Sequence, residues 1–308
     1  MTPELIITNA RILTMDEDRP RAQAIAIAGG RIVAIGSDAE VAAMAGPGTE
    51  LIDARGCSAL PGFVESHMHL FPGGAELDHA HIGGLRGAEA LGEALRGFAA
   101  RHPDRAVIIG QGADYGMLDH PMTRADLDAI LSDRPLAIMS HDHHTLWANT
   151  AALDAAGILR GHPTPHGHEV VMGADGLATG ELREFEAFGP VMALAGEERV
   201  NLGLATGKEP DPAPGPADRA TDRAKLARGL AHCAAHGVTS IVNMDGNRYT
   251  LELLDEIRRE GALSARVKVP FHFKPEMEIG ALDRACEMAA SFADDWLSSG
   301  FVKLFMDG

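Results

Sequence analysis

The sequence is poor in the residues that build disulfide-bonded or aromatic-rich proteins, with only two Trp, two Tyr and three Cys among 308 residues. Cys57, Cys233 and Cys286 are odd in number and far apart, which excludes a disulfide framework or a CxxC zinc site. No apolar run reaches the ~18 residues of a membrane span. The first residues lack the basic and apolar regions of a signal peptide. These absences favour a cytoplasmic location, where cysteines stay reduced.

Positive charge is also scarce: 27 Lys and Arg face 44 Asp and Glu, which gives a formal net charge of −17. Such a chain repels phosphate backbones and anionic lipids, so we expect neither a nucleic acid nor a membrane as partner. We expect a small-molecule substrate instead, and the sequence leaves a homo-oligomer open. The length suits one large α/β domain with an accessory domain.

The first 57 residues predict a small, mostly β unit. Two short strands lie within residues 4–15, separated by Thr8-Asn9, and another strand covers 50–53. Gly29-Gly30 between two β runs predicts a hairpin. A short helix is expected over 38–45, with Asp38 near its N-cap.

From residue 58 onward, helices and strands alternate. We expect strands at 58–66, 106–112, 136–140, 238–243, 267–273 and 301–305, and helices at 87–101, 123–130, 148–157, 222–236, 250–260 and 279–298. Residues 160–222 are rich in Gly, Pro and His and interrupted by breaker residues, and the clearest loop predicted there is Asp211-Pro-Ala-Pro-Gly-Pro. The alternation after residue 222 predicts a parallel sheet with crossover helices.

Histidine is abundant, with 15 residues, and the pair His67 and His69 directly follows the apolar strand 58–66. Residues i and i+2 of a strand point to the same side, so both imidazoles can face one point, as in many zinc half-sites. A bare HxH could equally be two polar loop histidines. Its place after a buried strand favours the metal-site interpretation.

Together with this pair, two stretches resemble the metal-dependent amidohydrolase superfamily. They run from Ile6 to Gly36 and from Ile52 to His69, the second containing a Leu-Pro-Gly-Phe-Val-Glu-Ser strand just before HxH. Further segments are similar to the branch called amidohydrolase 3. These are residues 127–130, 133–135, 144–149, 179–182 and 302–308. The resemblance covers essentially the whole chain.

The resemblance implies an α/β fold: a (β/α)₈ TIM-type barrel, its first half present here, with a small β-sandwich accessory domain. It implies one or two divalent metal ions, zinc being favoured, at the carboxyl ends of the barrel strands. His67 and His69 match the first-strand ligands, and Lys303 matches a fourth-strand lysine that carbon dioxide converts to a metal-bridging carbamate. A lysine between apolar residues is costly as an ammonium ion, which agrees with this role. Without the resemblance, Lys303 would be interpreted as a surface lysine at a strand end.

The same resemblance divides the chain into two parts. Residues 1–57 would be part of the β-sandwich, and residues 58–308 would contain barrel strands one to four with an insertion at about 76–222. A complete barrel takes about 250 residues, so we expect this chain to be the first part of a longer protein. Two further histidines and the catalytic Asp implied by the resemblance would then lie beyond residue 308. His272, after the third barrel strand, is not a ligand in the family pattern.

In the insertion, His144, Trp147 and Asn149 match positions implied to line the substrate pocket. For His144, a structural role is equally open, and its neighbours His141 and His143 are interpreted as loop residues. Glu181 and Glu184 are further candidates for the pocket.

Two interpretations concern residues near the predicted ligands. Glu65 could orient a metal ligand or be structural. Asp245-Gly246 is interpreted as an ordinary turn, and so is Asp307 with Gly308.

The favoured function is hydrolysis of an amide or other non-peptide C–N bond, in an N-acyl or formamide-like small molecule, by metal-activated water. The same fold and metal could instead serve an isomerase or a decarboxylase. A third alternative is a barrel that binds a metal without catalysis.

Overall fold

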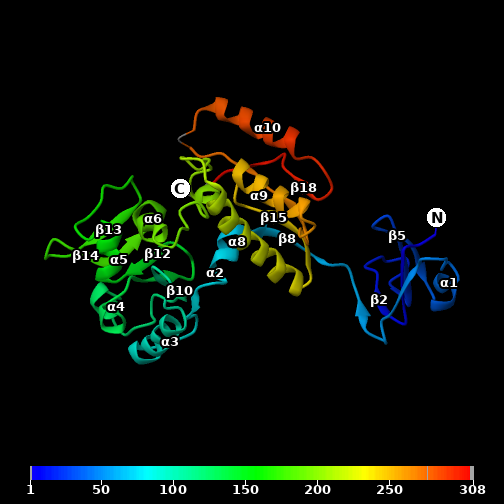
Figure 1. Ribbon diagram of the computed structural model, residues 1–308, viewed down its shortest axis with the longest axis horizontal. Coiled ribbons are helices and arrows are strands. Elements are labelled where there is room, and N and C mark those ends of the chain that lie inside the picture. The colour runs from blue at the N-terminus through cyan, green and yellow to red at the C-terminus, as the bar shows by residue number, and fades with distance from the viewer. Residues whose placement is uncertain (1, 276, 306–308) are drawn as a thin grey trace. The chain divides into compact units, whose positions relative to one another are not determined.

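The computed structural model describes residues 2–275 and 277–305. The chain divides into two compact units, with the boundary after Phe63 (Figure 1). Its mixed α/β content agrees with the predicted fold class. Within the described residues, none of the helices is long and apolar enough to cross a membrane.

Unit 1, which ends at Phe63, contains two small sheets and a short helix. The larger sheet has the order β5-β4-β1-β6, and the smaller has the order β3-β2-β7. The strands are β1 (Leu5–Thr8), β2 (Arg11–Leu13), β3 (Arg21–Ala22), β4 (Ala24–Ala28), β5 (Arg31–Gly36), β6 (Glu50–Asp53) and β7 (Ser58–Ala59). The predicted hairpin is confirmed: β4 and β5 are antiparallel, and Gly29 and Gly30 between them have φ of 57° and 69°.

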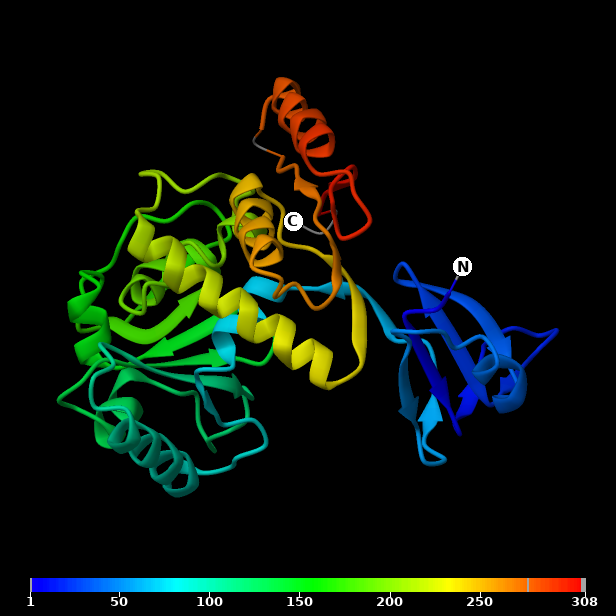
Figure 2. The same cartoon turned by 45° about the vertical axis from the view of Figure 1, so that its right-hand side comes forward.

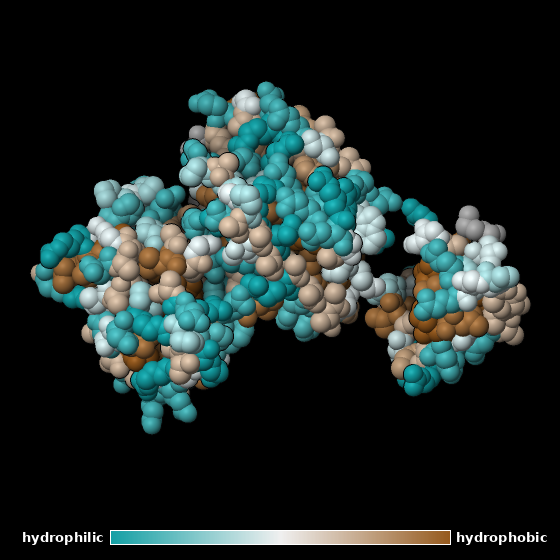
Figure 3. All heavy atoms as spheres, in the orientation of Figure 1, coloured by the Kyte–Doolittle hydropathy of each residue, from teal (hydrophilic) through white to brown (hydrophobic). Residues whose placement is uncertain are grey.

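One face of the larger sheet packs on α1 (Asp38–Ala42), which buries Ile6, Ala24, Ala26 and Val41. The helix begins at Asp38, as predicted, but ends at Ala42, three residues before the predicted end. Its N-cap is Ser37, which forms a capping box with Glu40. Large apolar side chains remain exposed elsewhere on this unit, and Figure 3 shows them gathered on the visible face. They include Ile32, Val33, Leu51 and Ile52.

Unit 2 contains the predicted alternation of strands and helices. Its four-stranded sheet has the order β18-β16-β15-β8, so spatial order follows chain order. These strands are β8 (Phe63–Met68), β15 (Val238–Asn243), β16 (Arg266–Lys268) and β18 (Leu297–Ser298). Beyond a break in the last two, β17 (Phe271–His272) pairs in parallel with β19 (Val302–Lys303).

The helices beside this sheet are α2 (Leu70–Glu76), α8 (Pro216–Ala235), α9 (Arg248–Arg259) and α10 (Leu282–Ser291). Apolar residues from these helices and strands form one core, with Phe71, Leu226, Leu254 and Phe271 among its fully buried members. Helix α8 begins six residues before its predicted start, because Pro216 takes a first-turn position that suits proline. The helix predicted over 279–298 is wrong at its end, since Leu297–Ser298 forms β18.

Helices α2 and α8 approach each other unusually closely. A Cβ placed on Gly74 of α2 would lie 2.3 Å from the Lys225 carbonyl oxygen of α8. Figure 2 shows α8, in yellow, crossing beside the cyan segment that contains α2. Only a residue without a side chain permits this contact, so Gly74 fixes how α2 lies against α8.

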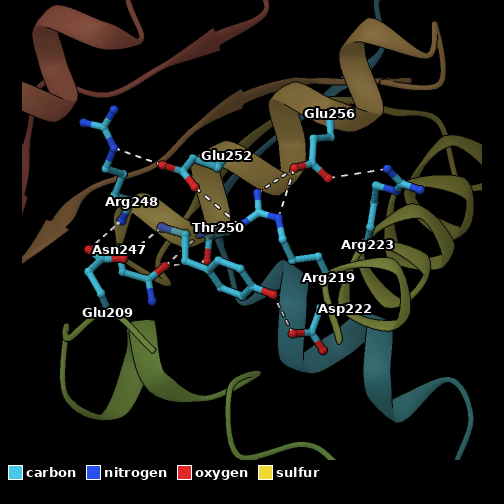
Figure 4. Close-up of polar contacts among 10 residues, drawn as sticks. Glu209, Arg219, Asp222, Arg223, Asn247, Arg248, Thr250, Glu252 and Glu256 are labelled. Atoms are coloured by element: carbon cyan, nitrogen blue, oxygen red, sulfur yellow. Dashed lines mark hydrogen bonds and ion pairs between the residues drawn. The ribbon is translucent and has the colours of Figure 1, made fainter. Parts of the chain in front are cut away.

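Charged side chains join α8 to α9 on the outer surface (Figure 4). Arg219 of α8 contacts Glu252 and Glu256 of α9, and Arg223 contacts Glu256 as well. The Tyr249 hydroxyl donates to the buried Asp222 carboxylate at 2.8 Å. These ion pairs link the two helices at the surface, and the apolar residues of the same helices pack against each other in the core.

The part of the chain between α2 and α8 in sequence forms a separate six-stranded sheet with the order β13-β14-β12-β11-β10-β9. Its strands are β9 (Ala80–His81), β10 (Ile108–Ala113), β11 (Leu136–Ser140), β12 (Thr145–Ala148), β13 (Glu169–Met172) and β14 (Ala178–Arg183). Strands β9, β10 and β11 are parallel, and the remaining pairs are antiparallel.

Helices cover both faces of this sheet. The buried clusters place α3 (Ala88–Arg101) and α4 (Arg124–Ile130) on one face, and α5 (Thr150–Ala155) and α6 (Phe185–Ala193) on the other. The predicted loop at 211–216 is confirmed up to residue 215, but the sequence indicated no helices or strands in the rest of 160–222, where β13, β14, α6 and α7 (Leu202–Ala205) lie. These elements were not predicted because glycines at the strand ends, and Pro190 inside α6, are residues that usually interrupt helices and strands.

Candidate active site

The two histidines of the HxH pair lie at the carboxyl end of β8. His67 belongs to the strand, and His69 is the N-cap of α2. Their ring centroids are 5.4 Å apart and the rings are nearly perpendicular, at 75°. His67 is exposed and the His69 side chain is 34% exposed. Both imidazoles are therefore adjacent and accessible from outside the core.

A buried carboxylate orients one of these rings. Asp245, two residues beyond β15, places Oδ1 2.7 Å from His69 Nδ1, and its side chain is only 1% exposed. Because an ionised carboxylate can only accept, His69 Nδ1 donates to it, and in the neutral form of the ring Nε2 then carries the lone pair that a metal can use. Interpreting Asp245-Gly246 as an ordinary turn missed this contact. The available signal was a polar Asn-Met-Asp segment at the carboxyl end of an apolar strand.

The same segment holds the start of α2. The His69 side chain does not cap this helix. Instead the Leu70 amide donates to Asn243 Oδ1 at 2.8 Å, and the Phe71 amide donates to Asp245 Oδ2 at 3.4 Å. Helix amides without a partner inside the helix are thus satisfied from the neighbouring strand. Asp245 therefore contacts both the His69 ring and the first turn of the helix that follows it.

Lys303 lies on β19, paired in register with His272 of β17. Burial lowers the pKa of Lys303; the Asp245 carboxylate acts in the opposite direction, and the Lys274 ammonium lowers this pKa further. Its Nζ lies 4.7 Å from the centroid of the Phe305 ring. Asp245 therefore contacts His69 directly and acts on Lys303 through its charge. Asp307 lies outside the described residues.

His272 is enclosed rather than presented to the site. It is fully buried, its Nδ1 lies 3.1 Å from the Gly203 carbonyl oxygen, and its ring packs edge-on against Phe305. A Cβ on Gly246 would come within 2.6 Å of the His272 amide nitrogen. The glycine after Asp245 therefore allows β17 to approach the end of β15.

Residues 2–275 and 277–305 contain no group of three His, Cys, Asp or Glu side chains placed to hold a metal ion. What they present is two imidazoles, one of them oriented by a carboxylate, and a lysine with a lowered pKa. This donor set fits a metal when the lysine supplies oxygen ligands as a carbamate, since neutral imidazole and anionic oxygen are both common zinc ligands. Glu65, for which the sequence left an orienting and a structural role open, accepts from the His67 backbone amide at 3.1 Å.

The predicted pocket residues of the insertion occupy different environments. His144 is well exposed, with Nδ1 2.9 Å from Glu184 Oε1. Trp147 is buried in the core on the α3 and α4 side of the sheet, edge-on to Tyr115. Asn149 is fully buried and caps α5. Its side chain also bonds backbone groups of Leu131, Arg134 and Leu136.

These contacts favour structural roles for Trp147 and Asn149 over the expected contact with substrate. The Asn149 side chain uses its oxygen and both amide hydrogens on backbone partners, so it has no remaining donor for a ligand. Glu181 forms an ion pair with Arg183 at 2.7 Å. Of the three predicted pocket residues, His144 is the one that presents polar atoms to solvent.

A charged cleft of about 480 Å³ lies on the outer surface between α8, α9 and the end of α10. Its four arginines, Arg219, Arg248, Arg258 and Arg259, are each paired with a carboxylate. The cleft therefore offers balanced charge rather than a set of free donors. It is lined by helix residues away from the strand ends that carry His67, His69 and Lys303.

We compared the chain with protein families and with curated proteins. Residues 50–308 match the model of the amidohydrolase family. The N-substituted formamide deformylase of Arthrobacter pascens is 30% identical over 60% of this chain and 35% of its own length. The exoenzymes regulatory protein AepA of Pectobacterium carotovorum is 30% identical over 52% of this chain and 36% of its own length.

Among solved structures, a metal-dependent hydrolase from Pyrococcus horikoshii has the same fold, with a TM-score of 0.61 at 23% identity. The match covers 92% of this chain and 50% of the hydrolase. The chain thus spans about a third of the length of the two curated relatives and half of this structure.

Proposed function

Because this chain belongs to the amidohydrolase family, we propose that it carries the metal-binding part of an enzyme that hydrolyses an amide or other non-peptide C–N bond. The observation that carries the proposal is the 2.7 Å contact between Asp245 and His69. A carboxylate behind a histidine fixes the ring and its tautomer, which is a common arrangement behind metal-binding imidazoles.

In this proposal, His67, His69 and carboxylated Lys303 hold one or two divalent ions, with zinc favoured. The neutral Lys303 amine required for carbamate formation is promoted by its burial, which lowers its pKa. A bound ion would supply Lewis acidity and activate water near neutral pH. The four sheet strands in chain order support a (β/α)₈ barrel whose first half is present here.

We place the substrate between these ligands and the insertion, where His144 offers an imidazole held by Glu184. The name of the Arthrobacter pascens relative supports an N-substituted formamide as one substrate class, together with other N-acyl compounds. The unit that ends at Phe63 is proposed to be part of a β-sandwich.

The test uses the protein expressed from its complete gene. Native mass spectrometry and elemental analysis should find one or two divalent ions, and an added mass of one carbon dioxide that disappears in Lys303→Ala. His69→Asn should lose metal, whereas His166→Asn, a control at an exposed position in the insertion, should retain it. A wild-type protein that takes up no metal would refute the proposal.

The type of reaction is tested with N-alkylformamides and N-acyl amines in ¹⁸O-labelled water. Hydrolysis places the label in the released carboxylate. Conversion of substrate without incorporation of the label would favour isomerase or decarboxylase chemistry instead.

A further inference from the structure

The far end of α2 makes a contact that the proposed chemistry does not use. The helix begins directly after His69 and ends at Glu76. Glu76 Oε1 lies 2.7 Å from His143 Nε2, in the turn between β11 and β12. The Gln111 amide lies 2.9 Å from the same ring nitrogen. This contact connects the helix that follows the HxH pair to the turn that carries His144.

The backbone of this turn is held in an uncommon conformation. His143 has φ of 66°, in the left-handed region that favours glycine. In the described part of unit 2, the non-glycine residues with positive φ are His143 and Glu184. Glu184 is the residue that binds the His144 ring, and its amide donates to the His144 carbonyl oxygen at 2.9 Å. Such conformations persist where surrounding contacts hold them, and they concentrate at functional sites.

Contacts inside the turn give it a defined shape. Asp142 Oδ1 accepts from the Ser140 hydroxyl at 2.6 Å and from the His144 amide at 3.2 Å. The turn is therefore built locally, while its imidazoles at His143 and His144 reach carboxylates on other elements, Glu76 and Glu184. Each imidazole has one ring nitrogen engaged by a carboxylate.

We propose that Glu76 and His143 form a positioning latch that sets the distance between the HxH pair and the His144 side of the substrate pocket. Helix α2 acts as the spacer, with His69 just before its first residue and the latch at its last. The proposal rests on the proposed function, since it takes His144 as a substrate contact. Holding a binding group in place before the substrate arrives improves affinity without adding a contact.

The charges around the latch agree with this role. The Glu76 hydrogen bond raises the pKa of His143; burial opposes this, and the Asp142 carboxylate raises the pKa further. The titratable groups acting on His143 are thus Glu76 and Asp142. A charge-assisted hydrogen bond is shorter and stronger than a neutral one, which suits a contact between half-exposed side chains.

The test compares Glu76→Ala, Glu76→Gln and His143→Asn in the full-length, metal-loaded protein. Asparagine tolerates positive φ, so His143→Asn should preserve the turn. Its side chain is too short to contact Glu76, so the hydrogen bond is lost. Glu93→Ala, at an exposed position on α3, is the matched control. Amide hydrogen exchange over residues 141–144 should accelerate about threefold or more in Glu76→Ala and His143→Asn. Glu76→Gln, which keeps an acceptor, should fall between these and the wild type.

The kinetic arm uses an N-alkylformamide. We expect KM to rise about three- to tenfold in Glu76→Ala, with kcat and bound metal unchanged. The double variant with His143→Asn should be no worse than the single ones, because both remove the same contact. Exchange over 141–144 that matches the Glu93→Ala control would overturn the latch. So would faster exchange with KM unchanged. A wild type that exchanges as expected yet hydrolyses nothing would refute the proposed function instead, so the two failures are distinct.

Discussion

Replacing Asp245 by Asn should weaken metal binding without unfolding the protein. Asp245 Oδ1 accepts from His69 Nδ1 while Oδ2 accepts from the Phe71 amide. An asparagine has one oxygen and one amide group, so it can satisfy one of these two donors and must place its own donor against the other. If the amide faces His69, the ring is driven to the tautomer whose Nε2 carries hydrogen and cannot bind a metal.

The expected size follows from burial and contact length. Loss of a partner that orients a metal-binding histidine typically costs 10- to 100-fold in affinity. That factor corresponds to about 1.4 to 2.7 kcal/mol of binding free energy. Since Asp245 is only 1% exposed and the contact is 2.7 Å, water does not replace it easily, and we expect the upper half of this range.

The assay is competition between the full-length protein and a chelator of known affinity for zinc. Asp283→Asn, at an exposed position on α10, provides a control of the same chemical change. Thermal unfolding of the metal-free proteins should show a modest loss of stability in Asp245→Asn, because one helix amide of α2 loses its acceptor. A zinc affinity within twofold of the control would refute the orienting role of Asp245.

Other consequences concern stability. Gly74→Ala should destabilise by roughly 1–3 kcal/mol because its Cβ would meet the Lys225 carbonyl oxygen at 2.3 Å, whereas Gly73→Ala, with open space, should be neutral or slightly stabilising in urea unfolding. Asn149→Ala should cost about 1–3 kcal/mol in the same assay, since it leaves buried backbone groups unpaired; a loss below about 0.5 kcal/mol would contradict its structural role. The folded pKa of His143 is raised above 6.5 by its carboxylate partner, so its contribution is full below the unfolded pKa and is lost as pH rises through the folded value. The stability difference between wild type and His143→Asn should therefore be larger near pH 5.5 than near pH 8.5, and equal differences would contradict this.

Much of the fold could be predicted where local pattern and tertiary structure agree. The hairpin at Gly29-Gly30, the capped helix α4 and the parallel order of β15, β16 and β18 all carry strong local signals. The region 160–222 could not, because β13 and β14 are short and separated by a turn containing Gly176, and α6 contains a proline. Their stability comes from pairing and from the buried cluster they share with α5, which no short window reveals.

For the candidate site, sequence pattern and family resemblance predicted His67, His69 and Lys303 as ligands, but missed Asp245, which contacts the His69 ring. His67 and His69 are visible because their i, i+2 spacing follows a recognisable strand. Asp245 is separated from His69 by 176 positions in sequence, and the two meet because β15 lies next to β8. Asn149 shows the opposite failure: a polar residue in a motif that suggested a pocket is taken up by backbone capping.

The three fixed points of α2 explain why these contacts matter together. Its start is held by Asp245 at the end of the next strand, its middle approaches α8 closely at Gly74, and its end contacts His143 of the insertion. A helix of seven residues has little stability of its own, so its position is set by these neighbours. Because His69 is its N-cap, a displacement at the start or middle of the helix should move the His69 ring, whereas the Glu76 end acts on the turn that carries His144. Variants at Asp245 and Gly74 should therefore both lower zinc affinity, Asp245 the more because it contacts the His69 ring directly, and equal effects would contradict this order.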